Sequence, residues 1–404
     1  MSLITGMGTT FNLPNYVGEL FGLTPEETPL LSAIGGLTGG GMTTAVEMEW
    51  QTYDLRDPGQ RTKVEGATAP TAEERTRDRV RNVVQIHQEK VSVSYTKQAA
   101  KGQIATPSAD PYRGVPGTNP VQSELDWQVA QAVKGIALDV NWSFWNGQYS
   151  NPTTNATARK TRGLLQAITT NKITKATSTV TGLSSATDTI TETSTGLAND
   201  DKIVFTNTGD ATNIVAGRVY YVVSKSTNAF KVATSQGGSA LTLGTSTSNI
   251  DYLKPWTTTL TTDVIDDLVQ KAYDNGGMSE QFTAVLACNS SQKRAITKAY
   301  ADAYGKSVMV TENARSIAGV SVETVQTDFG RLGLMLDRHL PQDALAALSL
   351  EQLRPVMLSI PDKGVFFEEP LAKTGASDEV QIYGEIGLEY GSERAHAQVR
   401  GLKV

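Results

Sequence analysis

The pattern of apolar and polar positions divides the chain into segments of different periodicity. Apolar and polar residues alternate over residues 46–51, which predicts a strand because successive side chains of a strand point to opposite faces. Alternation returns over residues 84–86 and continues in the opposite phase over residues 91–95. A change of phase within a strand predicts a bulge or bend. Together these stretches predict a long hairpin over residues 45–98.

A long amphipathic helix is predicted after the Gly- and Pro-rich loop at residues 99–118. Asn119 can cap the helix and Pro120 suits its first position. Apolar side chains then recur three or four positions apart as far as Phe144, and Gly147 follows the helix. At 1.5 Å per residue it would span roughly 40 Å. The residues expected to share its buried face are Val129, Val133, Ile136 and Val140.

The first part of the chain, residues 1–44, is rich in Gly and Thr and reads as an extended arm with one helical anchor. Thr24 can cap a short helix, Pro25 suits its first position, and Glu27 completes a capping box. Glycines at residues 35–41 then interrupt regular structure. We therefore expect the anchor helix to begin at Pro25.

Residues 173–255 differ from their surroundings in composition. Thr and Ser dominate, and turn residues separate short alternating apolar runs, which predicts an all-β module. Helical patterns flank this stretch on both sides, so it reads as an insertion. Residues 256–345 return to mixed helices and strands, and residues 346–404 read as strands that cross a sheet.

Charged residues of both signs crowd residues 54–81, where large apolar side chains are scarce. One interpretation is a solvated loop. The other is a surface that pairs with a neighbouring copy of the chain, because mixed signs suit self-complementary contacts whereas nucleic acid favours basic residues alone. The residues predicted to contact another subunit are Arg56, Asp57, Arg61, Lys63, Glu65, Glu73, Glu74, Arg75 and Arg77.

Composition narrows the class of protein further. The 404 residues are 39% hydrophobic and 19% charged, which is typical of a globular chain and not of a disordered one. The formal net charge of −6 argues against tight DNA binding by this subunit alone. The start of the chain lacks the features of a signal peptide, and no apolar run is long enough for a membrane span. These features predict use in the reducing cytoplasm or in a particle assembled there.

No arrangement of catalytic residues is apparent. The Gly-Lys-Ser sequence at residues 305–307 lacks the first glycine of a phosphate-binding loop, because position 300 is Tyr. The single cysteine, Cys288, lies in an apolar run and reads as a buried residue. The three histidines are far apart, so no metal cluster is predicted. We expect no enzyme activity and no cofactor, and a carbohydrate-active enzyme with a carboxylate pair brought together in space is the alternative.

Several short sequences then indicate a family. They are ETPLLSAIG at 27–35, EWQTYDL at 49–55, VEGA at 64–67 and RGLL at 162–165. With the order of predicted elements, they resemble the Hong Kong 97-type fold of tailed-phage major capsid proteins, an α+β fold. The resemblance covers nearly the whole chain outside residues 173–255. It implies an N-terminal arm, an E-loop hairpin, a P-domain with a long spine helix, and an A-domain.

The β-rich stretch has a resemblance of its own. AGRVYYVV at 216–223, NAFKVA at 228–233 and the two glycines at 237–238 look like a small β module of phage structural proteins. This resemblance implies a surface knob or a contact between capsomers. Some members of the capsid fold join subunits through Lys–Asn isopeptide bonds. Lys63 lies in the presumed E-loop, but no acid is placed by motif to catalyse such a bond.

The resemblance implies a structural subunit that assembles into hexameric and pentameric capsomers of an icosahedral shell around phage DNA, in the host bacterial cytoplasm. Portal, scaffolding and decoration proteins are implied partners, with non-specific contact to packaged DNA and no membrane. A tail, baseplate or decoration protein with a β adhesion module is the alternative. The expected domains are an N-terminal arm at 1–44, an E-loop hairpin at 45–98, a first P-domain part at 99–172, an inserted β domain at 173–255, an A-domain at 256–345 and returning P-domain strands at 346–404.

Overall fold

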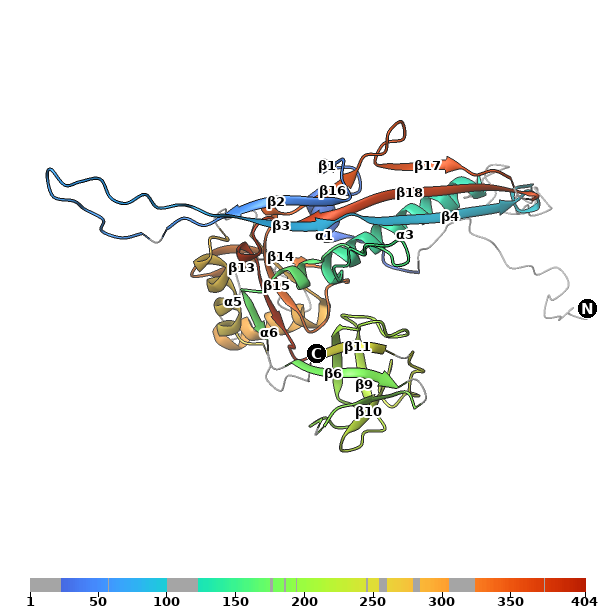
Figure 1. Ribbon diagram of the computed structural model, residues 1–404. Helices are drawn as coiled ribbons and strands as arrows, with labels where there is room; N and C mark the ends of the chain where they lie inside the picture. Colours follow the sequence, from blue (N-terminus) through green and yellow to red (C-terminus); the bar gives the residue numbers. More distant parts are fainter. Residues whose placement is uncertain are drawn as a thin grey trace, which may run out of the picture. The chain divides into compact units, whose positions relative to one another are not determined.

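The computed structural model describes residues 23–404 except 57, 100–122, 175–176, 185–186, 194, 245, 254–259, 279–283, 305–323 and 374 (Figure 1). The helices are α1 (Pro29–Ile34), α2 (Tyr95–Ala99), α3 (Glu124–Asn146), α4 (Leu164–Ala167), α5 (Thr262–Asp274) and α6 (Ser290–Tyr304), with short 3-10 turns η1 (Leu350–Gln352) and η2 (Glu393–Ala395). The strands are β1 (Gly41–Thr43), β2 (Glu47–Tyr53), β3 (Arg77–Val83), β4 (Gln85–Ser94), β5 (Lys172–Thr174), β6 (Thr177–Ser184), β7 (Thr189–Thr191), β8 (Lys202–Asn207), β9 (Val219–Val223), β10 (Ala229–Ala233), β11 (Ser246–Leu253), β12 (Ala284–Cys288), β13 (Thr324–Thr327), β14 (Gly330–Leu336), β15 (Leu345–Ser349), β16 (Arg354–Leu358), β17 (Phe366–Pro370), β18 (Ser377–Glu389) and β19 (Ala397–Arg400).

The described residues fall into two compact units. The first contains Gln88–Ile136 and Phe367–Tyr383, and the second contains Glu27–His87, Ala137–Phe366 and Gly384–Val404. Three expectations lie outside the described residues: most of the N-terminal arm, Asp57, and the helix start at Asn119 and Pro120.

Two sheets carry most of the strands outside the β-rich stretch. One has the order β1-β16-β18-β17, with β4 also paired to β18, and the other has the order β13-β14-β12-β15-β19-β5. In the second sheet, β12 is parallel to β14 and antiparallel to β15. A single apolar core joins this sheet to α5 and α6. The strands of the last stretch, 346–404, are divided between the sheets, because β16 and β18 belong to the first and β19 to the second.

The first described helix begins at Pro29, so the expected start at Pro25 is wrong. Thr28 occupies the cap position, but its side chain accepts no capping hydrogen bond from a backbone N–H of the helix. Glu27, expected to close a capping box, instead lies 2.8 Å from the Nε atom of Arg338. Either proline suits a first helical position, and contacts far along the chain decide between them.

Asp337 follows β14 directly, is fully buried, and joins α1 to the second half of α3. Its carboxylate accepts hydrogen bonds from the N–H of Leu30 at 3.4 Å, from Trp145 Nε1 at 2.9 Å and from Asn141 Nδ2 at 3.0 and 3.2 Å. The Oδ1 atom of Asn141 in turn accepts the N–H of Leu31 at 2.9 Å. Side chains distant in sequence therefore satisfy the first N–H groups of α1, which have no partner within the helix.

The spine helix predicted from periodicity is present as α3, which has 23 residues and ends at Asn146 as expected. Its most buried apolar positions follow one another at intervals of four. They are Ala132, Ile136, Val140 and Phe144, all at most 5% exposed, and Trp145 beside the last of them is fully buried as well. Val133, expected on the same face, is 40% exposed. Consecutive helix positions differ by about 100° around the axis, so Val133 cannot share the face that Ala132 buries.

Six strands between Thr177 and Leu253 close into a barrel with the order β10-β7-β6-β11-β8-β9. Its interior is a separate apolar cluster in which Phe205 contacts the rings of Tyr220 and Tyr252 edge to face. Thr177 and Leu253 are register partners on neighbouring strands. The described chain thus enters and leaves the barrel at adjacent points.

Candidate inter-subunit interface

A two-stranded ribbon is formed by β2 and β3. Its second strand was expected from the alternation at residues 84–95, but the structure pairs β2 with Arg77–Val83, which lies mostly within the charged stretch, and pairs β4 with β18 instead. The strands are antiparallel, with Glu47 opposite Val83 and Tyr53 opposite Arg77. Residues 54–76 connect them as the long loop drawn in blue in Figure 1, and every described residue of this loop is exposed. A loop of this kind buries nothing within its own subunit.

The chain bends where β3 ends. Val83 closes β3 and Gln85 opens β4, so Val84 belongs to neither strand. Val83 and Val84 are both fully buried, which breaks the alternation and agrees with the predicted change of phase. Ile86 was expected to share a face with Val84, yet it is 45% exposed. The alternation restarts in β4, which pairs with β18, whereas β3 pairs with β2.

Both strands of the ribbon are held at their base. On β2, the indole N–H of Trp50 donates a 2.7 Å hydrogen bond to the carbonyl of Gly391, and its ring meets Tyr390 edge to face at 4.9 Å between centroids. On β3, the fully buried side chain of Asn82 donates to the carbonyl of Leu388 at 2.7 Å. The end of β18 and the residues directly after it therefore fix both strands.

Asn82 makes a second set of contacts, with the backbone of Arg162. Its Oδ1 accepts the Arg162 N–H at 2.8 Å and its Nδ2 donates to the Arg162 carbonyl at 3.1 Å. Nearby, Gly387 of β18 allows a close approach, because a Cβ there would lie 2.7 Å from the carbonyl oxygen of Val83 and would collide with Met48. These contacts make the base of the ribbon rigid, in contrast to its exposed loop.

Within the loop, predicted contact residues converge on one carboxylate. Glu73 accepts hydrogen bonds from Arg75 at 2.7 Å and Arg61 at 3.0 Å, and Arg56 lies 3.8 Å away. The hydrogen bond from Arg75 is the largest influence that lowers the pKa of Glu73. All four side chains are between 42% and 52% exposed. Exposed ion pairs stabilise a fold only weakly, so the cluster leaves the loop available for other contacts.

The remaining predicted contact residues do not join this cluster. Arg77 donates to Oε1 of Gln51 across the ribbon at 3.2 Å. The side chains of Lys63, Glu65 and Glu74 are exposed and form no hydrogen bond or ion pair with the part of the chain that the structure describes. The structure therefore brings four of the predicted residues together, leaves Lys63, Glu65 and Glu74 along the loop and places Arg77 on β3.

The charge pattern concealed three large apolar residues at this end of the ribbon. Tyr53 is 69% exposed, Leu55 77% and Val64 80%. Burying one such side chain stabilises an association by about 1.5–3 kcal/mol. These three residues do not form a regular alternation of apolar and polar positions, so periodicity did not mark them. Each is nevertheless visible in the sequence as a large apolar residue.

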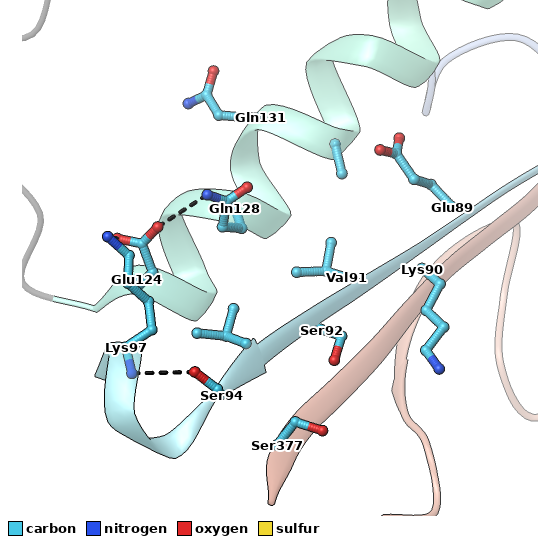
Figure 2. A pocket seen from close by; sticks show the side chains of 12 residues that line it. Glu89, Lys90, Val91, Ser92, Ser94, Lys97, Glu124, Gln128, Gln131 and Ser377 are labelled. Atoms are coloured by element: carbon cyan, nitrogen blue, oxygen red, sulfur yellow. Dashed lines mark hydrogen bonds and ion pairs between the residues drawn. The ribbon is translucent and has the colours of Figure 1, made fainter. Parts of the chain in front are cut away.

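An open groove of about 720 Å³ lies in the first unit between β4 and the start of α3. Figure 2 shows Val91 facing the helix from the strand, with Glu124 and Gln128 on the helix side. Gln128 donates to Glu124 at 3.0 Å, one turn away. The lining contains serine, lysine and glutamate side chains but neither His nor Cys.

Cys288, His87 and His396, elsewhere in the described chain, are buried. Burial raises the pKa of the Cys288 thiol to about 11, the opposite of what a reactive thiolate needs. Burial also lowers the pKa of His87 and of His396 to about 4. Among the described residues, no group of three or more metal-ligating side chains comes together. No described helix is long and apolar enough to cross a membrane.

Solved structures with the same arrangement of elements are capsid proteins. The capsid of cyanophage A-1(L) gives a TM-score of 0.55 at 11% identity, covering 99% of this chain and all of that one. The capsid of cyanophage P-SCSP1u gives 0.51 at 10% identity, covering 100% and 96%. The capsid of a native GTA particle gives 0.50 at 11% identity, covering 100% and 99%. The chain therefore has the Hong Kong 97-like capsid fold of viral shell subunits.

The family follows from the sequence as a whole. The model of the family described as SU10 major capsid protein matches residues 3–403, so the chain belongs to that family. No curated protein matches the chain. As a member of this family it is a non-enzymatic structural protein of the virion and forms the icosahedral shell of a phage. It therefore associates with copies of itself.

Proposed function

We propose that the ribbon and its loop are a principal contact between copies of the chain within hexameric and pentameric capsomers. The observation that carries this proposal is the contrast between the base and the loop. The base is fixed by buried contacts of Trp50 and Asn82, whereas all described residues of 54–76 are exposed. Contacts that repeat head to tail around a ring need a projecting element held at a defined angle.

The composition of the loop supports a protein partner. The cluster around Glu73 presents charges of both signs, which suits a copy of the same surface. Tyr53, Leu55 and Val64 add apolar area that a neighbouring subunit would remove from water. The nine predicted contact residues keep this role in the proposal, with Arg56, Arg61 and Arg75 acting through Glu73.

The domain division is part of the same proposal. Residues 1–44 act as an arm, 45–98 as the E-loop hairpin, 99–172 and 346–404 as the P-domain, and 256–345 as the A-domain. The β barrel within residues 173–255 acts as an inserted, independently folding module at the capsid surface. Its separate apolar core and the adjacency of Thr177 and Leu253 support this, because inserted domains keep their ends close together.

We include further partners in the proposal. The implied portal, scaffolding and decoration proteins would meet the assembled shell, and packaged DNA would make non-specific contact. The net charge of −6 argues only against tight DNA binding by a single subunit, because such a subunit carries a basic face.

The test is assembly of a protein in which residues 57–74 are replaced by a short Gly-Asn turn. Subunits of this variant should fold and remain soluble, because the loop buries nothing in its own subunit, but they should form no shells in electron micrographs. Lys134→Ala is the control, since its ion pair with Glu26 is 47% exposed and lies outside the ribbon. Normal shells from the loop variant would refute the proposed contact.

A further inference from the structure

The outer face of the ribbon carries two rows of charge that differ in sign. Alternate residues of a strand share a face, so Glu47 and Glu49 form a row on β2. The row on β3 consists of Arg77, Arg79 and Arg81. The opposite face holds Met48, Trp50 and Asn82, which are the residues that fix the base of the ribbon. Val83, opposite Glu47, ends the charged face at the base of the ribbon and is buried. Beyond it the charged face is open, because the side chains of Arg79 and Arg81 are 77% and 63% exposed.

The two rows contact each other loosely. Arg81 lies 3.4 Å from Glu47, and Arg79 lies 3.9 Å from Glu49. The arginine side chains are 63% and 77% exposed. Ion pairs this exposed contribute little to folding, so an arginine can exchange its partner for a carboxylate of another molecule at small cost.

The separation of sign by strand is informative. Like charges two positions apart on a strand lie about 7 Å from each other and repel, whereas signs that alternate along each strand would avoid this repulsion. Charged residues protect the edges of a two-stranded sheet from aggregation. That protection does not require the two signs to lie on different strands. Segregation instead makes the β2 edge acidic and the β3 edge basic.

We propose that the arginine row on β3 of one copy pairs with the glutamate row on β2 of the next copy. The inference rests on the proposed function, since it assumes that the ribbon lies between subunits. Opposite edges of one element meet in a head-to-tail contact, which is the kind that closes into rings. A second copy fits better than nucleic acid, because the glutamates beside the arginines would repel phosphates.

Charge reversal of each row tests the pairing. One variant, Arg79→Glu with Arg81→Glu, has two acidic rows, and the other, Glu47→Arg with Glu49→Arg, has two basic rows. Each alone should fold with the wild-type melting temperature, and the assembled fraction in sedimentation velocity should fall by about tenfold or more, because like rows meet at every contact. An equimolar mixture should recover six-membered rings, since the two variants can alternate and an acidic edge then meets a basic edge at every contact. A five-membered ring keeps one contact between like rows, so recovery is scored on six-membered rings.

A third variant carries all four substitutions and reverses the polarity of the ribbon, so it should assemble alone. Assembly of either single-row variant at the wild-type level would overturn the inference. Recovery of assembly in the four-substitution variant but not in the mixture would also overturn the inference. The two rows would then interact only within one chain. If a reversed variant fails to fold, Glu47→Gln with Glu49→Gln should weaken assembly and reduce its dependence on salt, and an unchanged salt dependence would overturn the pairing.

The loop replacement separates this inference from the proposed function. If the replacement of residues 57–74 blocks assembly while row reversal does not, only the pairing of rows is wrong. If neither change affects assembly, the ribbon is not a subunit contact at all.

Discussion

Replacing Asp337 by Asn should detach α1 from the rest of its unit. The carboxylate is fully buried and its two oxygens accept hydrogen bonds from backbone and side-chain donors alone. An Asn side chain has nearly the same shape but presents an NH₂ group in place of one oxygen. In either orientation of the Asn side chain, its NH₂ group faces an N–H donor that had bonded to the carboxylate. That donor is then left without another acceptor.

The less damaging orientation places the NH₂ group toward the N–H of His339, which donates to Oδ1 at 2.8 Å. It keeps the oxygen that accepts from Leu30 and Trp145. Losing one charge-assisted hydrogen bond and leaving a buried donor unsatisfied costs about 3 kcal/mol. Asp337→Ala removes every acceptor and should cost more, about 4–5 kcal/mol.

The assay is urea unfolding of the unassembled subunit, followed by circular dichroism, with limited proteolysis to detect release of α1. Asp267→Asn is the matched control, because this exposed α5 side chain accepts no hydrogen bond from the described chain and its replacement should change stability by less than about 0.5 kcal/mol. An Asp337→Asn protein as stable and as resistant to protease as the control would refute the capping role of Asp337.

Three further predictions follow from burial. Ile136→Asp places an unpaired carboxylate at a position that is 3% exposed, so expression should give insoluble protein. Lys134→Ala, at an exposed ion pair, should leave the melting temperature unchanged. A soluble Ile136→Asp subunit would contradict the prediction that α3 is a buried spine helix. The fully buried His396 has a pKa lowered to about 4, so only the unfolded chain gains a proton at this residue as the pH falls from 6.5 to 4. The free energy of unfolding should therefore fall by on the order of 3 kcal/mol over this range. A His396→Asn protein should lose this contribution to the pH dependence in urea titrations. Residues 173–255 expressed alone should give a β-type circular dichroism spectrum and a cooperative melt, and Phe205→Ala should abolish the melt because it empties the barrel core, whereas a disordered spectrum from the unchanged segment would argue against an independent module.

Periodicity in the sequence determined the elements whose stability comes from an apolar face. It predicted α3 and its end at Asn146, the first strand of the hairpin with a bend near Val84, and a β-rich stretch that the structure forms as a barrel. It missed β3, which lies mostly within the stretch of residues 54–81 that was marked only by its charge. These features are local, because the spacing of neighbouring residues is enough to define one face. The density of charge between residues 54 and 81 likewise marked the candidate interface before any fold was known.

Tertiary structure alone decided which residues meet. Charge density did not reveal that Arg56, Arg61 and Arg75 converge on Glu73, nor that the base of the ribbon rests on Asn82.

The start of α1 was mispredicted for the same reason, since the N–H of Leu30 bonds to Asp337, about three hundred positions away, and the N–H of Leu31 bonds to Asn141. A single sequence records which residues can donate, accept or pack. It does not record which distant partner lies within hydrogen-bonding distance, because that depends on how the strands and helices pack together.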